Sequence, residues 1–455
     1  MGGVGSVIVA TAPSFTVAIL GHCVMGCGLA NQPLLFTIIA EILPRRWRSF
    51  GHASLMVTSC LGSTVGLLVV GGIPPQDHFG AWRTYYFVNL GCHAVGVLFA
   101  VLAYRSPSPD MPEVVQRREL TRMDWPGYTI LFFALSAFSA SFFISHAPTS
   151  AEQDSAIPGF LVGLLMVIAL LIYELVGRKD GFLNHNLFLH RNFALATLSL
   201  FGAGVSFAAF EWCFLTQTVN LYDADPFLSG VRSIVTLVSA MIAAPLAAWY
   251  CCAKRKIRGA SVVGFAACLA FYIAMAHTDQ TTNIQTWIYP TFLGAAMGIL
   301  MVTLPTSAQL SIPSQLLSMG TALLICGFIL GRSIGFIIYD HLVQSAMVEG
   351  YPAIVHRLLY SGSPKEFADE VITYLKSNQA GPLPDVPGLT DAILDDGMAA
   401  LKACYVAAFK KAWIAAGCFA GVSMLTASPM DNPEEQFTMK IDVPLESTAE
   451  VEPKP

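Results

Sequence analysis

Charged residues are scarce in this sequence. Only 12% of its 455 residues are Asp, Glu, Lys or Arg, whereas 55% are hydrophobic. A soluble globular domain has about a quarter of its residues charged, and this chain's density is too low to cover a water-facing surface of its size. Most of the chain must therefore face lipid. The net charge of −5 is small and says little about partners. The basic residues cluster in short loops and form no nucleic-acid footprint, so we predict no nucleic-acid partner.

The sequence also lacks the motifs of enzymes and cofactor sites. It contains no G-x-x-x-x-G-K-[ST] phosphate loop and no dinucleotide, kinase or hydrolase signature. A membrane-embedded enzyme is disfavoured as well, because no apolar run gathers a cluster of His, Asp and Glu. We therefore predict that the protein is not an enzyme, with no catalytic residue and no cofactor.

Cysteine is present but shows no pattern of a metal site. The 11 cysteines are odd in number, irregularly spaced and mostly within apolar runs. Such residues are typical small apolar packing groups. The pattern excludes a disulfide framework or a zinc site, so we predict no metal.

Long hydrophobic runs dominate what is present. A membrane-spanning helix needs about 20 mostly apolar residues, and about eleven runs meet that length. Residues 2–12 are apolar but too short to cross, at about 1.5 Å per residue. The predicted fold class is an all-α integral membrane protein that crosses the bilayer many times. The runs cover residues 15–43, 53–73, 84–104, 125–146, 157–177, 193–219, 228–252, 259–277, 287–306, 318–339 and 404–426.

Basic residues mark alternate loops. The loops near residues 45–48, 105–122, 178–191 and 254–258 are rich in Arg and Lys, whereas the loops between them hold almost none. Basic loops face the cytoplasm in membrane proteins. This pattern predicts the orientation of the spans and supports their assignment.

Two polar segments lie outside the runs. Residues 340–401 are long, polar and interrupted by prolines, and we predict an extracellular loop with short helices inside it. Residues 428–455 are polar and acidic, and we predict a disordered cytoplasmic tail.

Five short motifs follow one another along the chain at the ends of the runs. They resemble motifs of the fourteen-span drug:proton antiporter branch of the major facilitator superfamily. Within that branch they are most similar to fungal trichothecene-efflux-pump-like and siderophore-transporter-like proteins. The motifs are AEILPRRWR (40–48), GAWRTYYFVN (80–89), MDWPG (123–127), FLHRNFAL (188–195) and GRSIGFIIY (331–339).

The resemblance implies a major-facilitator helical bundle, with two packed halves and two extra spans between them. Residues 1–12 would then be the end of the family's third span, and the first two spans would be missing. The implied divisions are the remainder of the N-terminal half at 1–104, the extra central spans at 105–177, the C-terminal half spans at 178–339, the extracellular loop at 340–401, the last span at 402–427 and the tail at 428–455.

The resemblance also implies a function. Rocking of one half against the other around a midplane site would give alternating access, with a proton gradient as the energy source. The expected cargo is a small lipophilic toxin or drug leaving the cell, and siderophore transport is the alternative. The implied partners are the small molecule, protons and the lipid bilayer, with a monomer in the plasma membrane.

Two departures from the family pattern keep a different class of function open. His22 stands where the family has an arginine in its fourth span, and Leu67 replaces the proline of the antiporter motif at 62–72. Together with the missing spans, these departures favour a truncated, non-transporting membrane protein or a sensor as the alternative to a transporter.

Two ionisable residues within the runs are the leading site candidates. A charge in lipid costs roughly 3 kcal/mol or more, so such residues commonly serve a function. Glu211 is predicted to face a central cavity and bind a proton or a cationic substrate; the alternative is a protonated glutamate bonded to a neighbouring span. Arg332 is predicted to contact an anion or substrate, or to pair with Glu211, and the alternative is a packing arginine.

Four further residues complete the candidate set. His22 and Gln32 lie on one run, with a spacing compatible with one helix face, and each is either a proton or substrate ligand or a packing group. Trp212 adjoins Glu211 and could line a lipophilic pocket or face lipid. For Arg232, close to an outer span end, a structural role is the favoured interpretation.

Overall fold

The computed structural model describes residues 1–72, 82–103, 124–145, 156–177, 185–222, 225–361, 367–376 and 390–442. Within these ranges the chain is helical and contains no strand. Eight of the described helical stretches are long and apolar enough to cross a membrane. Each of the eleven predicted runs coincides with a helix or with consecutive helices, so the all-α membrane fold is confirmed.

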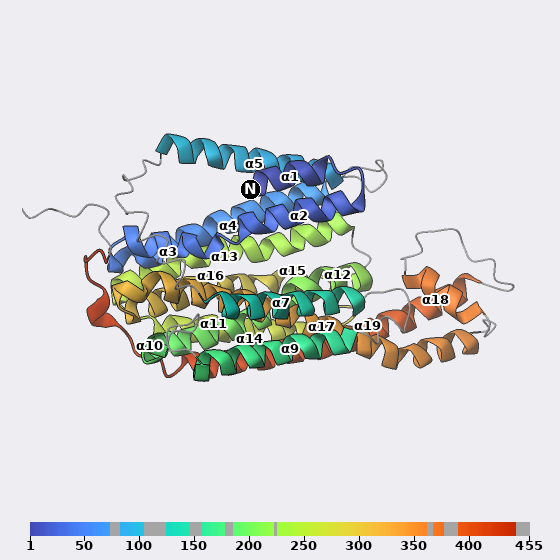
Figure 1. Ribbon diagram of the computed structural model, residues 1–455. Coiled ribbons are helices and arrows are strands. Elements are labelled where there is room, and N and C mark those ends of the chain that lie inside the picture. The colour runs from blue at the N-terminus through green and yellow to red at the C-terminus, as the bar shows by residue number, and fades with distance from the viewer. Residues whose placement is uncertain are drawn as a thin grey trace, which may run out of the picture.

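In chain order the helices fall into an N-terminal group, a middle pair called the central pair, and a C-terminal group (Figure 1). The N-terminal group is α1 (Gly2–Ala10), α2 (Phe15–Leu29), α3 (Gln32–Ile42), α4 (Arg48–Gly71) and α5 (Trp82–Ala103), and the central pair is α7 (Trp125–Ser145) and α9 (Ala156–Ile172). The C-terminal group is α10 (His185–Phe188), α11 (Arg191–Ala209), α12 (Leu215–Tyr222), α13 (Pro226–Lys254), α14 (Arg258–Ala276), α15 (Gln285–Ile288), α16 (Pro290–Ser311), α17 (Leu317–Tyr360), α18 (Ala368–Lys376) and α19 (Asp391–Ala427).

The run at 15–43 is divided in two. α2 ends at Leu29 and α3 begins at Gln32, with Pro33 in the first turn of the new helix. Proline has no backbone N–H to donate and fits a helix start, where that donor has no partner in any case. The proline therefore explains why one run gives two helices.

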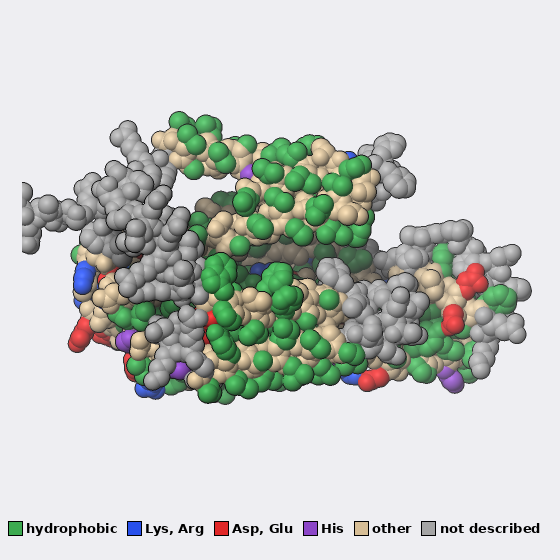
Figure 2. All heavy atoms as spheres, in the orientation of Figure 1, with side chains coloured by type: hydrophobic (Ala, Val, Ile, Leu, Met, Phe, Trp, Pro, Cys, Tyr) green, Lys and Arg blue, Asp and Glu red, His purple; other side chains and the backbone are tan. Residues whose placement is uncertain are grey.

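Helices pack both within and between the groups. Within them, α1 packs on α2 and α5 of the N-terminal group, and α7 packs on α9. α4 contacts α13 and α16, α3 contacts α17, and α7 also contacts α17. α17 therefore touches all three groups. Figure 2 shows apolar side chains along the flank of the bundle and most of the visible charged side chains toward its two ends.

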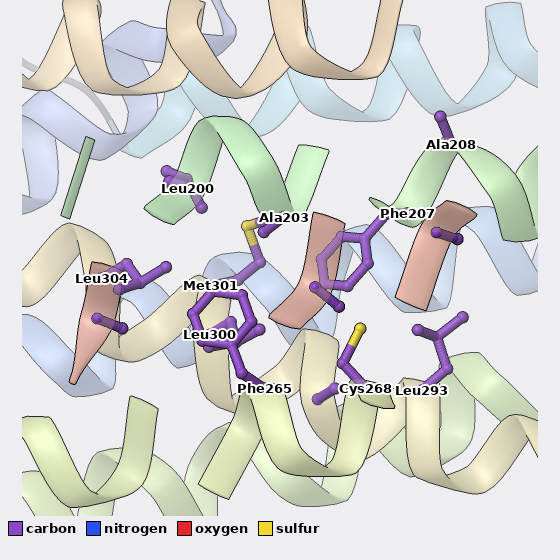
Figure 3. Close-up of a cluster of buried hydrophobic side chains, with 14 of the residues drawn as sticks. Leu200, Ala203, Phe207, Ala208, Phe265, Cys268, Leu293, Leu300, Met301 and Leu304 are labelled. Atoms are coloured by element: carbon purple, nitrogen blue, oxygen red, sulfur yellow. The ribbon is translucent and has the colours of Figure 1, made fainter. Parts of the chain in front are cut away.

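The hydrophobic core belongs to the C-terminal group. In the best 18-residue window of the stretch at 191–222, 61% of residues are buried, against 11% for the stretch at 15–42. Side chains from α11, α14 and α16 interdigitate in this core (Figure 3). They include Leu200, Phe207, Phe265, Cys268, Leu293, Leu300 and Leu304.

Glycines allow α11 and α17 to approach each other closely. A Cβ atom added at Gly204 would lie closer than 3.0 Å to the carbonyl oxygen of Phe328, and one at Gly331 would lie equally close to that of Phe201. A Cβ atom added at Gly335 would likewise lie closer than 3.0 Å to the carbonyl oxygen of Val205 on α11. Small residues at such a seam let two membrane helices pack backbone to backbone.

The prediction of an extracellular loop at 340–401 needs correction in its secondary structure. α17 continues without interruption to Tyr360, and α19 begins at Asp391, so both helices extend beyond the predicted spans. With α18 they surround a separate hydrophobic cluster that includes Ile354, Leu358 and Val371. Apolar residues at helical spacing thus stabilise a helical cap in a segment whose polarity and prolines indicated a loop.

The prediction of a disordered tail at 428–455 is wrong for its first part. Residues 428–442 pack against the bundle, with Met430 and Phe437 buried and Asp442 in ion pairs. Two apolar anchors and a carboxylate that neutralises buried arginines explain this order. Residues 443–455, like the basic loop at 105–122, lie outside the described residues.

The glycine seam can be tested on one helix. Gly331→Ala should lower the free energy of unfolding by about 1–3 kcal/mol, because its Cβ would collide with backbone that cannot rotate away. Gly327→Ala is the matched control, since its nearest neighbour would be the Thr197 side chain at 3.8 Å. Thermal unfolding of the two variants in detergent measures the difference. Equal midpoints would show that the seam tolerates a methyl group.

Candidate functional site

Glu211 lies in an irregular turn of a long helical stretch. α11 ends at Ala209, and the chain forms the π-helical turn η3 (Phe210–Phe214) before α12 begins. A π-turn places an extra residue in the helix and changes the direction of the side chains that follow; such turns frequently occur at functional sites. The sequence predicted a continuous helix here and not this irregularity.

Glu211 and Arg332 form an ion pair between α11–η3 and α17. Glu211 Oε2 lies 2.6 Å from Arg332 Nη2. The Glu211 side chain is 31% exposed and the Arg332 side chain 39% exposed, so the pair lies at an open face and not inside the packed core. Arg332 directly follows Gly331, so the glycine seam fixes the position of its backbone relative to α11. The structure therefore brings together the two leading candidates.

Aromatic residues neighbour Glu211 and Arg332 along η3 and α17. Trp212 packs edge to face on Phe336, one helical turn after Arg332, with ring centroids 6.5 Å apart. Phe210 stacks on Phe214 within the π-turn at 4.8 Å. Trp212 is thus part of the contact between η3 and α17.

A cavity of about 390 Å³ lies further along α17. It is lined by residues of the extra pair α7 and α9 and by five residues of α17: Ile337, Ile338, Asp340, His341 and Leu342. Most of the lining is apolar, including Phe160, Leu161 and Ile338, and Asp340 and His341 contribute polar groups. Its volume is in the range of a small-ligand pocket.

Arg232 is a buried, hydrogen-bonded side chain near the start of α13, a setting that agrees with the structural role favoured above. Its side chain is only 4% exposed. Nη1 donates to Thr286 Oγ1 at 2.9 Å, and Nη2 donates to Asn283 Oδ1 at 2.6 Å. The guanidinium also lies 4.8 Å from the centroid of the Trp287 ring. These contacts tie α13 to the segment before α16.

His22 and Gln32 are not part of the ion-pair site. His22 lies on α2, where Nδ1 contacts Ala18 O at 2.8 Å and Nε2 contacts Tyr86 Oη of α5 at 2.9 Å. Gln32 begins α3 and is exposed. Both therefore belong to the N-terminal group, whereas Glu211 and Arg332 belong to the C-terminal group.

Two buried polar contacts were missed by the sequence analysis. Trp413 Nε1 donates to Gln217 Oε1 at 2.6 Å, and Gln217 Nε2 donates to Thr278 Oγ1 at 2.7 Å, joining α12 to α19 and to the end of α14. His52 Nε2 and Gln309 Oε1 are 2.9 Å apart, joining α4 to α16. A glutamine within an apolar run was the available signal in both cases.

Gln309 extends the second contact to two more helices. Its Nε2 donates to Phe36 O and to Thr321 Oγ1, both at 3.2 Å. One buried amide therefore bridges α3, α4, α16 and α17. Across the described ranges, no group of three or more His, Cys, Asp or Glu residues is arranged to hold a metal ion.

The sequence matches the Major Facilitator Superfamily over residues 1–336. The chain belongs to the major facilitator superfamily. Among the curated relatives, a probable efflux pump, gsfJ, of Penicillium aethiopicum is 23% identical over 70% of this chain and 57% of its own length. The MFS-type transporter grgE of Penicillium sp is 28% identical over 54% and 43%. The Aspyridones efflux protein of Neocamarosporium betae is 26% identical over 53% and 43%. The chain thus spans about half the length of these relatives.

Family membership confirms several predictions. The superfamily is one of membrane transporters, so this chain is a multi-pass membrane protein of a transporter family and not an enzyme. The similarity to fungal efflux pumps agrees with the resemblance drawn from the five motifs.

The different settings of two arginines predict different stabilities. Arg232→Leu should lower the free energy of unfolding by about 2 kcal/mol, because it leaves buried Thr286 without its hydrogen bond to a charged group and also removes the bond to Asn283. Arg332→Leu should cost less than about 1 kcal/mol, because its ion pair is partly exposed. Thermal unfolding of both variants in the same detergent tests this. A larger loss for Arg332→Leu would contradict the assignment.

Proposed function

We propose that this chain exports small lipophilic molecules across the plasma membrane as a monomer, coupled to proton entry. Membership of a transporter family and similarity to proteins named as efflux pumps support the transport of a small molecule outward. The observation that carries the coupling is the ion pair of Glu211 and Arg332 between two helices of the C-terminal group.

The ion pair has two states, with Glu211 ionised or protonated, and binding or release of a proton converts one into the other. While Glu211 is ionised, it binds the guanidinium of Arg332 and links η3 to α17. A proton on the carboxyl removes its charge and most of this attraction, so the link weakens. A ligand shifts a conformational equilibrium only if it binds the two conformations with different affinities. A proton meets this condition here, because it binds Glu211 more readily in a conformation without the ion pair than in one with it. Both side chains are partly exposed, as proton exchange with a water-filled cavity would require.

The surroundings of the pair suit an apolar cargo. Trp212 and Phe336 lie beside the ion pair, and the 390 Å³ cavity under α7 and α9 has an almost wholly apolar lining. Binding sites for small molecules are mostly apolar with a few placed polar groups. This chemistry favours a lipophilic molecule over a strongly polar iron chelate, which keeps siderophore transport second.

Neutralising Glu211 should remove the response to protons. With Glu211→Gln, efflux of lipophilic fluorescent dyes from cells should fall about tenfold and no longer rise as the external pH is lowered, because the amide cannot exchange a proton. The assay compares dye efflux across external pH values at matched protein levels in the membrane.

Glu349→Gln is the matched control. Glu349 also pairs with a cation, Lys411 at 2.5 Å, but on the helical extension of α17 and with both side chains about half exposed or more. Dye efflux by the Glu349→Gln variant should depend on external pH as it does in the unchanged chain. Should Glu211→Gln retain that response, proton coupling at Glu211 is wrong. Absence of dye efflux from the unchanged chain would instead favour the non-transporting alternative.

A further inference from the structure

The segment after α19 is a strap that crosses one end of the bundle. We define the C-terminal strap as residues 428–442. It first binds the C-terminal group: Asn432 Oδ1 accepts hydrogen bonds from the backbone N–H groups of Ile257 and Arg258, at 3.0 and 3.1 Å, where α14 begins. Asp431 and Asn192 exchange two further hydrogen bonds of 2.8 and 2.9 Å. The strap is therefore anchored at the starts of α11 and α14.

Two apolar side chains fix the middle of the strap. Met430 packs into the main hydrophobic core, and Phe437 belongs to a small buried cluster with Cys251, Ile257 and Leu310. These contacts come from α13, from the segment before α14 and from α16. They hold the strap on the C-terminal group independently of its charges.

The last residues of the strap bind the N-terminal group. The backbone N–H groups of Arg45 and Arg46, in the turn between α3 and α4, donate to Lys440 O at 3.1 Å and Thr438 O at 3.0 Å. The Asp442 carboxylate accepts hydrogen bonds from Nε of Arg45, at 3.0 Å to Oδ1 and 2.9 Å to Oδ2. It also lies 2.5 Å from Nη2 of Arg48.

These charges are removed from water. The Arg48 side chain is 0% exposed, that of Asp442 1% and that of Arg45 14%. Burial alone would raise the pKa of Asp442, but the hydrogen bonds and charges of the two arginines outweigh burial and hold its pKa below the usual range. The carboxylate is therefore ionised at neutral pH. Removal of one member of a buried ion pair leaves the other charge uncompensated, so loss of the Asp442 charge should strongly weaken this contact.

We propose that the C-terminal strap is an intramolecular latch that holds the cytoplasmic ends of the two helix groups together and must release Arg45 and Arg48 before that end can open. The strap is continuous with α19 of one group and bound to the α3–α4 turn of the other, so separating these ends breaks the Asp442 contacts. The buried contact of His52 on α4 with Gln309 on α16 joins the same two groups of helices. This inference rests on the proposed transport function for its mechanical meaning, whereas the contact itself can be tested without transport.

The native Cys252 reports whether the α3–α4 turn stays packed against α13, as the latch requires. Cys252 is buried, and its Sγ lies 2.9 Å from Arg46 O. In the full chain in inside-out vesicles, Asp442→Asn should raise the rate at which a membrane-impermeant maleimide labels Cys252 by about tenfold or more. Mass spectrometry of the labelled peptides identifies the site.

Two controls accompany this labelling. Glu434→Gln removes another strap ion pair, with Lys256 at 3.8 Å, that is exposed and bonded to the C-terminal group only, so Cys252 should stay protected. Cys268, in the core of the C-terminal group, should stay unlabelled in Asp442→Asn if the variant is folded. Unchanged labelling of Cys252 in a folded Asp442→Asn variant overturns the latch.

A reversible lock tests the need for release, even where Asp442→Asn does not fold. The Arg46 N–H donates to Thr438 O, which brings the two backbones together, so a cysteine pair at these positions is the lock to test, and mass spectrometry first verifies that its disulfide forms. Oxidised Arg46→Cys/Thr438→Cys protein should lose about 90% or more of its efflux of lipophilic dye and regain it on reduction. The single variant Arg46→Cys, treated identically, controls for oxidation of native cysteines.

The outcomes separate the latch from the proposed function. Full efflux by the oxidised, cross-linked protein overturns the latch while leaving export intact. Absence of dye efflux from the unchanged chain overturns the proposed export. The Cys252 labelling then decides by itself whether Asp442 holds the strap in place.

Discussion

The close approach of α11 and α17 is the constraint on which the candidate site depends. Gly204, Gly331 and Gly335 let the two backbones touch, and only a residue without a Cβ allows this. The seam fixes Arg332 beside the irregular turn that carries Glu211, so a guanidinium and a carboxylate meet at 2.6 Å while remaining partly open. Wider spacing of the helices would separate the two charges, and Glu211 and Arg332 would no longer pair with each other.

The two groups of helices are held by different kinds of contact. The C-terminal group packs around an extensive core of aromatic and aliphatic side chains, whereas the N-terminal helices bury few residues. Their attachment relies on the α4–α13 and α3–α17 contacts, on the buried His52–Gln309 hydrogen bond and on the arginines of the α3–α4 turn. Such polar contacts are more specific than strong, since the cost of removing charges from water offsets much of their attraction. An interface of this kind suits groups that must separate and rejoin.

Local composition was enough to predict much of the fold. Each apolar run corresponds to helix because a lipid-facing backbone must satisfy its own hydrogen bonds. Glu211 and Arg332 could be named because a charge within an apolar run is costly and conspicuous. The π-turn, by contrast, leaves no mark in hydropathy, and the glycine seam depends on which helices become neighbours. Gln217 and Gln309 were overlooked because an amide carries no charge, although each bridges several helices. The order of the strap could not be predicted either, since it comes from contacts between Asp442 and arginines about 400 residues earlier in the chain.

The uninterrupted course of α17 has a mechanical consequence. A helix of 44 residues is about 66 Å long at 1.5 Å per residue. Because α18 and the start of α19 pack against its far end, the cap is rigidly coupled to the helix that carries Arg332. A tilt of about 10° around a point some 40 Å from the tip would move the cap by about 7 Å. Such a tilt would convert a small rotation at Arg332 into a larger displacement of the cap, which a pair of spectroscopic labels could follow.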